Sequence, residues 1–391
     1  MKNDFLKYQA QTSPYPLGLE VSHAKGSYIY DTNGKAHLDF VAGVSACTLG
    51  HCHPKVIEAI KEQVDKYMHV MVYGEYSQSP ATTYTKLLAN NLPDPLEVTY
   101  LVNSGTEAIE GALKLARRYT NRSQIIAAKS AYHGNTMGSL SLMDFEERKS
   151  VFRPLLPDIY HINFNNEEDL DKITTKTACV ILETIQGGAG FILPKNDYLK
   201  KVKERCIAMG ALLILDEIQP GFGRTGKLFA FEHYACVPDI LVIGKGMASG
   251  LPVGAFTASK EIMHALSENP KMGHITTFGG NPVIAASSLA TLKELLNTSI
   301  IEDTLNKEFL FKTLLKHTKI KEIRGKGLML ALILDSAETA NNLILKAKEK
   351  NLILFWLLFE NKAVRISPPL TISDKEIREG CNTILAILNS F

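Results

Sequence analysis

A run of four aliphatic residues, Ile240 to Ile243, constrains the fold of this chain more than any other stretch, because it lies between the breakers Pro238 and Gly244. An unbroken aliphatic run of this length is typical of a strand that is buried on both faces of a sheet. Lys245 follows directly, between Gly244 and Gly246, where missing side chains let a planar ligand approach the backbone. The stretch predicts a lysine held at the end of a buried strand.

A second apolar run, Ala211 to Leu215, ends in Asp216 in the same way. In open α/β sheets, ligands bind at the carboxyl ends of the parallel strands. Pyridoxal phosphate chemistry needs a lysine amine that can form an imine and a buried carboxylate that can face a pyridinium nitrogen. We therefore interpret Lys245 and Asp216 as catalytic residues of a site for this cofactor.

A third stretch has the outline of a phosphate cradle. A strand from Val98 to Val102 leads into a turn and then into a helix. In the turn, Ser104 and Thr106 offer hydroxyls, Gly105 permits close approach, and the free amides at the helix start favour an anion. Serine and threonine are also ordinary helix caps, so the phosphate interpretation depends on the order of motifs along the chain.

Two further strands end in polar residues. The strand from Ile125 to Ala128 ends near Tyr132 and His133, and an aromatic ring there can lie flat against a cofactor, although packing is the commoner role of such a ring. The strand that includes Val180 to Leu182 leads into Glu183. These residues are candidates for contacts with the cofactor.

Strands and helices alternate from about residue 98 to residue 258, which predicts an α/β fold with a mostly parallel sheet. An Asn-Gly hairpin lies within residues 26–40, after an arm over residues 1–25 that we expect to be irregular. The expected units are an N-terminal arm with part of a small domain (1–54), a large cofactor-binding domain (55–297) and the rest of a small α+β domain (298–391).

Composition excludes several classes of protein. The 391 residues include 43 basic and 41 acidic ones, mixed along the chain, so no charged surface indicates nucleic acid or membrane as a partner. The six cysteines are scattered, as in reduced cytoplasmic proteins, and we see neither a signal peptide nor a membrane span. His51-Cys52-His53 has no second ligand cluster, so we expect no metal.

Seven motifs, in this order, make the chain resemble the class III, or ω-amino, aminotransferases of the type I pyridoxal phosphate fold over nearly its whole length. They are G-H-C-H-P at 50–54, S-G-T-E-A at 104–108, Y-H-G at 132–134, E-T-I-Q-G at 183–187, L-D-E-I-Q-P-G-F-G-R-T-G at 215–226, I-G-K-G at 243–246 and T-F-G-G-N-P at 277–282. The resemblance is to acetylornithine and ornithine aminotransferases. It implies a seven-stranded sheet in the large domain and a small domain built from both termini.

The resemblance implies roles for single residues. Lys245 is similar to the Schiff-base lysine, and Asp216 to the partner of the ring nitrogen. The other cofactor contacts that it implies are Ser104, Gly105 and Thr106 at the phosphate, Tyr132 stacked on the ring, His133 and Glu183 beside it, Gln219 near the phenolic oxygen, and Thr277, which reaches the phosphate from the other subunit. That last contact implies a homodimer with shared active sites.

Two departures from the family pattern concern the substrate. Asn135 stands where the family usually has an arginine that clamps a substrate carboxylate, and Gly188 stands where it usually has a glutamate. That glutamate normally pairs with the arginine that matches Arg365. Arg365 is therefore our candidate for binding the substrate α-carboxylate. Either 2-oxoglutarate or pyruvate is the expected amino acceptor.

The function that we expect is transfer of an amino group from an ω-amino or diamino acid, similar to acetylornithine or ornithine, to a 2-oxo acid. An aminomutase or decarboxylase with the same fold would share the lysine and the aspartate, and only an assay separates them. A regulator that binds pyridoxal phosphate is a third reading, but it would need a basic DNA-binding arm for which the N-terminus has no room. A Rossmann dehydrogenase is disfavoured because no G-x-G-x-x-G follows an early strand.

Overall fold

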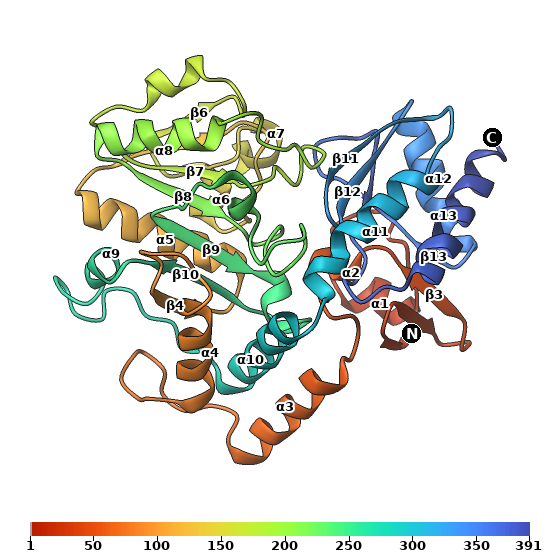
Figure 1. Cartoon of the computed structure of the whole chain (residues 1–391), viewed down its shortest axis with the longest axis horizontal. Coiled ribbons are helices and arrows are strands. Elements are labelled where there is room, and N and C mark those ends of the chain that lie inside the picture. The colour runs from red at the N-terminus through yellow and green to blue at the C-terminus, as the bar shows by residue number, and fades with distance from the viewer. Residues whose placement is uncertain (1) are drawn as a thin grey trace.

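A seven-stranded sheet forms the centre of the computed structural model, which describes residues 2–391 (Figure 1). Its strands are, in spatial order, β4 (Val98–Val102), β10 (Gly254–Ala258), β9 (Ile240–Gly244), β8 (Leu212–Asp216), β7 (Thr177–Glu183), β5 (Gln124–Ala128) and β6 (Ile159–Ile162). β10 pairs antiparallel with β4 and β9, whereas the pairs from β9 to β6 are parallel. This mostly parallel sheet confirms the predicted fold class.

The central strands are apolar on both faces because both faces are covered. On β8, Leu213 and Leu215 pack into one apolar cluster, and Leu212 and Ile214 pack into another. Residues of α8 (Tyr198–Met209) and α10 (Pro282–Asn297) belong to the first cluster, and residues of α5 (Gly105–Thr120) belong to the second. Side chains alternate between the faces of a strand, so a strand in this position needs an unbroken apolar run.

The register of the parallel strands brings polar residues to one edge of the sheet. Glu183, at the end of β7, pairs with Asp216, at the end of β8. Asp216 pairs in turn with Val242 of β9, and Lys245 follows the last residue of β9. The two carboxylates and the lysine therefore lie at the same carboxyl edge.

Two smaller four-stranded sheets complete the fold. The first has the order β1 (Val21–Lys25), β2 (Tyr28–Asp31), β3 (Ala36–Asp39) and β13 (Leu352–Ile353), and the second has the order β11 (Ile320–Lys326), β12 (Met329–Leu334), β15 (Ala363–Ile366) and β14 (Phe355–Trp356). Because β13 pairs with β3, segments near the two ends of the chain lie side by side (Figure 1). The domain boundaries near residues 54 and 297 stay a prediction.

The remaining helices surround these sheets (Figure 1). They are α1 (Lys2–Tyr8), α2 (Ala42–Ser45), α3 (Pro54–Lys66), α4 (Ser79–Ala89), α6 (Met137–Ser141), α7 (Glu146–Lys149), α9 (Lys260–His264), α11 (Ile300–Leu314), α12 (Ala337–Glu349) and α13 (Asp374–Leu388). α10 packs against α3 and α4. Within residues 2–391, no helix is both long enough and apolar enough to cross a bilayer.

Two local predictions were wrong. Residues 1–25 were expected to be an irregular arm, but α1 and the edge strand β1 lie within the described part of it. β1 is mostly exposed, so it lacks the apolar alternation that would have revealed it. The apolar stretch 352–359 predicts one strand by its sequence, but it divides at the buried Leu354 into β13 and β14, which belong to different sheets.

Candidate active site

A cavity of about 370 Å³ opens at the carboxyl edge of the central sheet. Small-molecule sites commonly enclose roughly 300–1,000 Å³. The cavity brings together most of the residues predicted from the sequence, namely Gly105, Thr106, Tyr132, His133, Asn135, Glu183, Gly188, Asp216, Gln219, Lys245 and Arg365. Ser104 and Thr277 are not part of its lining.

Lys245 has an unusual backbone for a residue with a side chain. Its φ is 43°, in the left-handed region, and it begins a 3₁₀ turn that runs to Ala248. A side chain at Gly246 would lie 2.2 Å from the hydroxyl of Thr48, so only glycine fits there. A left-handed backbone at a residue such as Lys245 persists only where the surrounding structure fixes it, and strain of this kind is concentrated at functional sites.

The environment of Lys245 lowers the pKa of its amine. Burial is the main cause, and the positive charge of Arg365 adds to it, whereas Asp216 and Glu183 act in the opposite direction. A lower pKa means that more of the amine is uncharged at neutral pH. An uncharged amine is the form that can act as a nucleophile or take up a proton.

Asp216 is buried and both its oxygens accept hydrogen bonds. Oδ1 accepts from the amide of Ile218 at 2.9 Å, and Oδ2 lies 2.8 Å from Nδ1 of His133. Burial by itself lowers the pKa of His133, but the hydrogen bond to Asp216 and the charges of Asp216 and Glu183 outweigh it and raise that pKa. The pair therefore favours an imidazolium next to a carboxylate.

Glu183 ties two loops of the cavity together. Oε1 accepts from the amide of Tyr132 at 2.8 Å, and Oε2 accepts from the amide of Gly187 at 2.7 Å. Burial is the main cause that raises the pKa of Glu183 to about 7. The phenol of Tyr132 accepts a hydrogen bond from the side chain of Asn135 at 3.1 Å, so Asn135 lies beside the tyrosine at the cavity wall.

The turn before α5 presents donors and hydroxyls to the cavity. Ser104 caps the helix, because its Oγ accepts from the amide of Glu107 at 3.3 Å. Thr106 Oγ1 lies 2.7 Å from the hydroxyl of Thr136 and 2.6 Å from that of Ser139. Gly105 and Thr106 line the cavity at the positive end of the helix dipole, which favours a phosphate.

Thr277 lies on the surface, in the loop before α10. The hydroxyl of its neighbour Thr276 accepts a hydrogen bond from Asn103 at 2.8 Å, so the loop lies against the start of the phosphate turn of its own chain. Thr277 itself is exposed and does not line the cavity of its own chain.

Arg365 lies on β15 and is 5% exposed. Its guanidinium is 5.5 Å from the ring centroid of Phe191, and Nε and Nη1 have no hydrogen-bond partner among the described residues. Burial lowers its pKa to about 10. A buried cation with free donors that opens on a cavity is suited to bind an anion.

Gly188 has a spatial explanation. A side chain at this position would lie 2.8 Å from the ring of Phe359, which therefore takes the space that a larger residue would need. The amide of Phe359 donates to the carbonyl of Gly188 at 2.9 Å, which holds the two segments together. Sequence analysis identified the small residue but not its aromatic neighbour.

Sequence reasoning also missed part of the cavity wall. Val44, Ile218 and Leu358 line it, and none of them has a polar group that would mark it in the sequence. Val44 lies on α2, whose four residues, Ala42–Ser45, all have positive φ and form a left-handed turn. A β-branched residue in this conformation is rare, so strong contacts must hold the turn.

Asp39 and His51 hold this turn from outside the cavity. Asp39 Oδ1 accepts from the amides of Val41 at 2.8 Å and Ala42 at 3.1 Å, and Oδ2 lies 2.9 Å from Nε2 of His51. The hydrogen bond to Asp39 is the main cause that raises the pKa of His51 to about 10. Ser45, at the end of the turn, lies 3.4 Å from Nε2 of Gln219.

Comparison with known proteins assigns the family. The family model described as aminotransferase class-III matches residues 8–388 of this chain. The chain belongs to the class III aminotransferases. Pyridoxal phosphate is the cofactor of this family.

This aminotransferase is similar to several characterised enzymes. It is 38% identical to an acetylornithine aminotransferase of Clostridium acetobutylicum, over 90% of this chain and 92% of the relative. It is 36% identical to a [LysW]-aminoadipate semialdehyde/glutamate semialdehyde transaminase of Sulfolobus acidocaldarius, over 94% of each chain. A solved ornithine aminotransferase of Toxoplasma gondii with partial occupancy of pyridoxal phosphate has a TM-score of 0.90 and 30% identity, over 100% of this chain and 95% of that one.

The residues of this aminotransferase fit pyridoxal phosphate. The cavity combines an amine of lowered pKa, a buried carboxylate and a helix N-terminus, which match the aldehyde, the ring nitrogen and the phosphate. Nε2 of His133 is buried and has no hydrogen-bond partner among residues 2–391, as expected of a group that contacts a bound ligand. A side chain at Gly134 would lie 2.3 Å from the hydroxyl of Thr106, which keeps the wall beside the phosphate turn thin.

Proposed function

We propose that this aminotransferase moves an amino group from an ω-amino or diamino acid to a 2-oxo acid. The observation that carries the proposal is the meeting of Lys245, Asp216 and Arg365 in one cavity, an amine, a carboxylate and an unpaired guanidinium. The acetylornithine and ornithine aminotransferases among the similar proteins support the choice of donor.

Lys245 moves the proton in this proposal. When bound, pyridoxal phosphate supplies a ring that withdraws electrons from the carbon that bears the substrate amine. Nζ of Lys245, whose lowered pKa favours the uncharged amine, takes the proton from that carbon and later returns it. The rigid strand β9 and the 3₁₀ turn fix the position of Nζ, so little entropy is lost when it acts.

The other residues hold the cofactor and the substrate. Asp216, supported by His133, would keep the ring nitrogen protonated, and Tyr132 would cover one face of the ring. Glu183 holds Tyr132 by its amide, and Gln219 would contact the phenolic oxygen. Gly105 and Thr106 would contact the phosphate, and Ser104 would support them by capping the helix. Arg365 would bind the substrate carboxylate. The cavity wall around the substrate includes Asn135 and Gly188.

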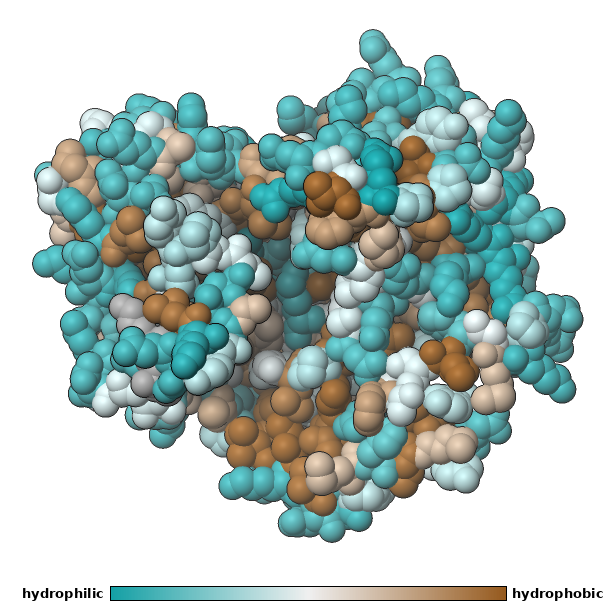
Figure 2. Space-filling view, turned by 180° about the vertical axis from the view of Figure 1, so that it is seen from behind, coloured by the Kyte–Doolittle hydropathy of each residue, from teal (hydrophilic) through white to brown (hydrophobic). Residues whose placement is uncertain are grey.

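We also propose a homodimer in which Thr277 completes the phosphate site of the other subunit. Seen from behind, apolar residues gather on the lower part of the molecule (Figure 2), where Figure 1 places α3, α4 and α10. Exposed apolar side chains of α3, of the α3–α4 connection and of the loop before α10 include Val64, Met68, Val70, Met71, Tyr76, Ile275 and Phe278. Apolar surface of this kind supports a protein–protein interface.

A cytoplasmic location is part of the proposal. All six cysteines are free thiols, four of them buried, as is usual in a reducing compartment.

Half-reactions test the function. The purified holoenzyme is mixed with acetylornithine, ornithine or a control amine, and the visible absorption of the cofactor is followed. Loss of that absorption, with its return on addition of 2-oxoglutarate or pyruvate, is the expected result. Release of carbon dioxide, or an isomerised amino acid without any need for an oxo acid, would instead identify a decarboxylase or an aminomutase.

Mixed dimers test the shared site. Lys245→Ala disables both sites of its homodimer because the amine is lost. Thr277→Asp does so because the aspartate repels the phosphate. If Thr277 acts across the interface, a mixed dimer regains one intact site, so about half of wild-type turnover per dimer returns. No recovery in purified mixed dimers would contradict this arrangement.

A further inference from the structure

Two stacked aromatic rings lie behind the cavity wall at Gly188. Leu358 and Gly188 line the cavity, and Phe359, which follows Leu358, packs against Gly188. The ring of Phe359 stacks on that of Phe145, with centroids 4.2 Å apart. The wall therefore continues from the cavity to the segment that contains α7.

Arg148, on α7, lies over this stack. Its guanidinium carbon is 5.4 Å from the ring centroid of Phe359, within the usual range of a cation–π contact. Burial raises the pKa of the Tyr132 phenol, and the charge of Arg148 acts in the opposite direction. Through Phe359, Arg148 lies beside the segment that lines the cavity at Leu358.

Arg148 has no carboxylate partner among the described residues, although acidic residues surround it. Its helix neighbour Glu146 is taken by Arg153, through two contacts of 2.8 and 2.9 Å, and by Lys149 at 3.4 Å. A guanidinium that stacks on a ring keeps its planar fork of N–H donors for an anion. No hydrogen bond joins the guanidinium donors of Arg148 to another of the residues that the structure describes.

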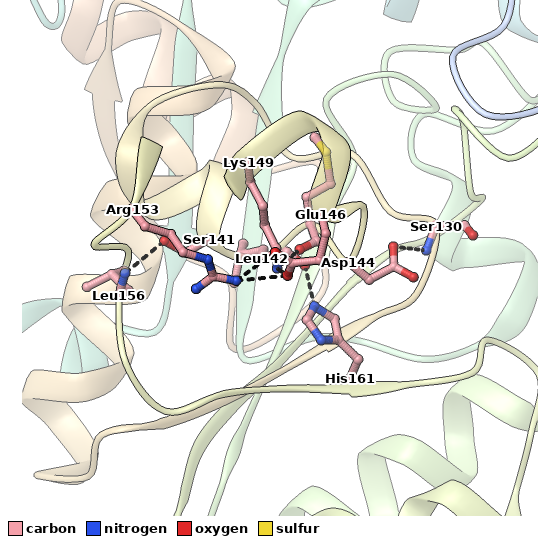
Figure 3. A network of polar contacts seen from close by, with 10 residues as sticks. Ser130, Ser141, Leu142, Asp144, Glu146, Lys149, Arg153, Leu156 and His161 are labelled. Atoms are coloured by element: carbon pink, nitrogen blue, oxygen red, sulfur yellow. Dashed lines mark hydrogen bonds and ion pairs between the residues drawn. The ribbon is translucent and has the colours of Figure 1, made fainter. Parts of the chain in front are cut away.

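The segment that bears Arg148 is held in place by polar contacts (Figure 3). The buried amine of Lys149 donates to the carbonyl of Met143 at 2.5 Å, and His161 Nε2 lies 2.9 Å from the carbonyl of Leu142. Asp144 accepts from the amide of Ser130 at 2.8 Å. A cation on a fixed segment loses little freedom when it binds, which favours recognition.

We infer that Arg148 binds the second carboxylate of a dicarboxylic 2-oxo acid, so that the acceptor spans from the buried Arg365 to the mouth of the cavity. The inference rests on the proposed transaminase function and makes its substrate class more specific. The neutral Asn135 lies at the cavity wall beside Tyr132, and Arg148 supplies a positive charge over Phe359, which packs on the wall residue Gly188.

Binding of unreactive acids tests the inference without turnover. Glutarate and pentanoate have the same carbon chain but two and one carboxylates, and each is titrated into the holoenzyme by calorimetry. We expect the wild-type protein to bind glutarate about tenfold or more tightly than pentanoate. Arg148→Gln should remove this preference, and Arg148→Lys should restore part of it.

Arg153→Gln is the matched control, because it removes a positive charge from the same segment but from a guanidinium that is already paired with Glu146. It should leave the preference for glutarate unchanged. A glutarate preference that survives in Arg148→Gln, or equal loss of binding for both acids, overturns the inference.

Kinetics give a second readout. Arg148→Gln should raise KM for 2-oxoglutarate about tenfold or more while kcat/KM for pyruvate stays within about twofold. Parallel changes for both acids would indicate a merely structural role. If neither acid accepts an amino group, the proposed function fails, and the calorimetric comparison still decides the role of Arg148.

Discussion

Oδ2 of Asp216 lies 2.8 Å from Nδ1 of His133, and Nε2 of the same imidazole is buried with no partner in the described part of the chain. Because Oδ1 already accepts from the amide of Ile218, His133 is the side chain that fixes the orientation of the carboxylate. The charge of Glu183 also favours the protonated imidazole. These three groups form one coupled cluster next to Lys245.

Replacement of His133 by leucine should weaken cofactor binding and slow turnover, because the buried carboxylate of Asp216 loses its side-chain donor. We expect turnover to fall about 10²-fold, whereas His133→Gln, which keeps an N–H donor, should retain more of it. Turnover and the dissociation constant of pyridoxal phosphate, measured for both variants, check this. Equal losses in the two variants would show that the imidazole charge, and not the hydrogen bond, is what matters.

Lys245→Ala should abolish the visible absorption of the lysine-linked cofactor and reduce turnover by about 10³-fold or more, because no other amine replaces Nζ. Spectra of the purified variant and an assay with added methylamine measure both effects. Lys260→Ala, which removes an exposed lysine, is the control and should change neither. An unchanged spectrum with retained turnover would dispose of the role assigned to Lys245.

Gly188→Glu should destabilise the protein by about 1–3 kcal/mol, although glutamate is the usual family residue, because its side chain meets the ring of Phe359. The φ of Gly188 lies outside the left-handed region, so backbone strain adds nothing. The double variant with Phe359→Ala should recover part of this loss, compared with Phe359→Ala alone. Urea unfolding of the four proteins measures the coupling, and strict additivity would contradict the steric argument.

The ion pair of His51 with Asp39 should make stability depend on pH. The pKa of His51 rises to about 10 in the folded state from about 6.5 in the unfolded chain. Its stabilising contribution is therefore complete below pH 6.5 or so and is lost as the pH rises toward about 10.

The size of this effect is about 1–2 kcal/mol, since the imidazole is partly exposed and solvent screens its charge. His51→Gln should lose less stability than the wild-type protein between about pH 6 and about pH 9.5. Urea unfolding of both proteins at these two pH values measures the difference. The same slope for both proteins would show that His51 is neutral when folded.

Arg365→Lys should raise KM for the amino donor about 10²-fold with a much smaller change in kcat, because an ammonium does not reproduce the fork of the guanidinium. Arg324→Lys is the control, since Arg324 is paired with Glu322 at the surface. Steady-state kinetics with one donor measure both. A fall in kcat at constant KM would place Arg365 outside substrate binding.

Much of the fold and of the cavity was predictable, for one physical reason. Burial on both faces forces an unbroken apolar run, so β8 and β9 were evident in the sequence, and the residues just after them had to lie at the carboxyl edge. Lys245, Asp216 and Glu183 therefore follow from local patterns and from the rule that ligands bind at this edge.

The parts that were not predictable depend on contacts between distant segments. The residues Ala42–Ser45 do not themselves indicate a left-handed turn: Asp39, which accepts from the amides at its start, is held by His51 and by the pairing of β3 with β13. Phe359 fills the space at Gly188 from another sheet region, and Arg148 lies over the ring of Phe359 although the two residues are far apart in the sequence. Single-sequence patterns do not encode such distances.

The parallel pairing of β3 with β13 has a consequence for biosynthesis. All strands of the central sheet lie between Val98 and Ala258, so a nascent chain can build that sheet early. Ile353 lies opposite Asp39, whose carboxylate holds the turn that bears Val44, and Arg365 comes later still. While the chain is on the ribosome, the substrate side of the cavity is thus the last to form. Until β13 is made, the edge of β3 has no strand partner and is accessible to chaperones.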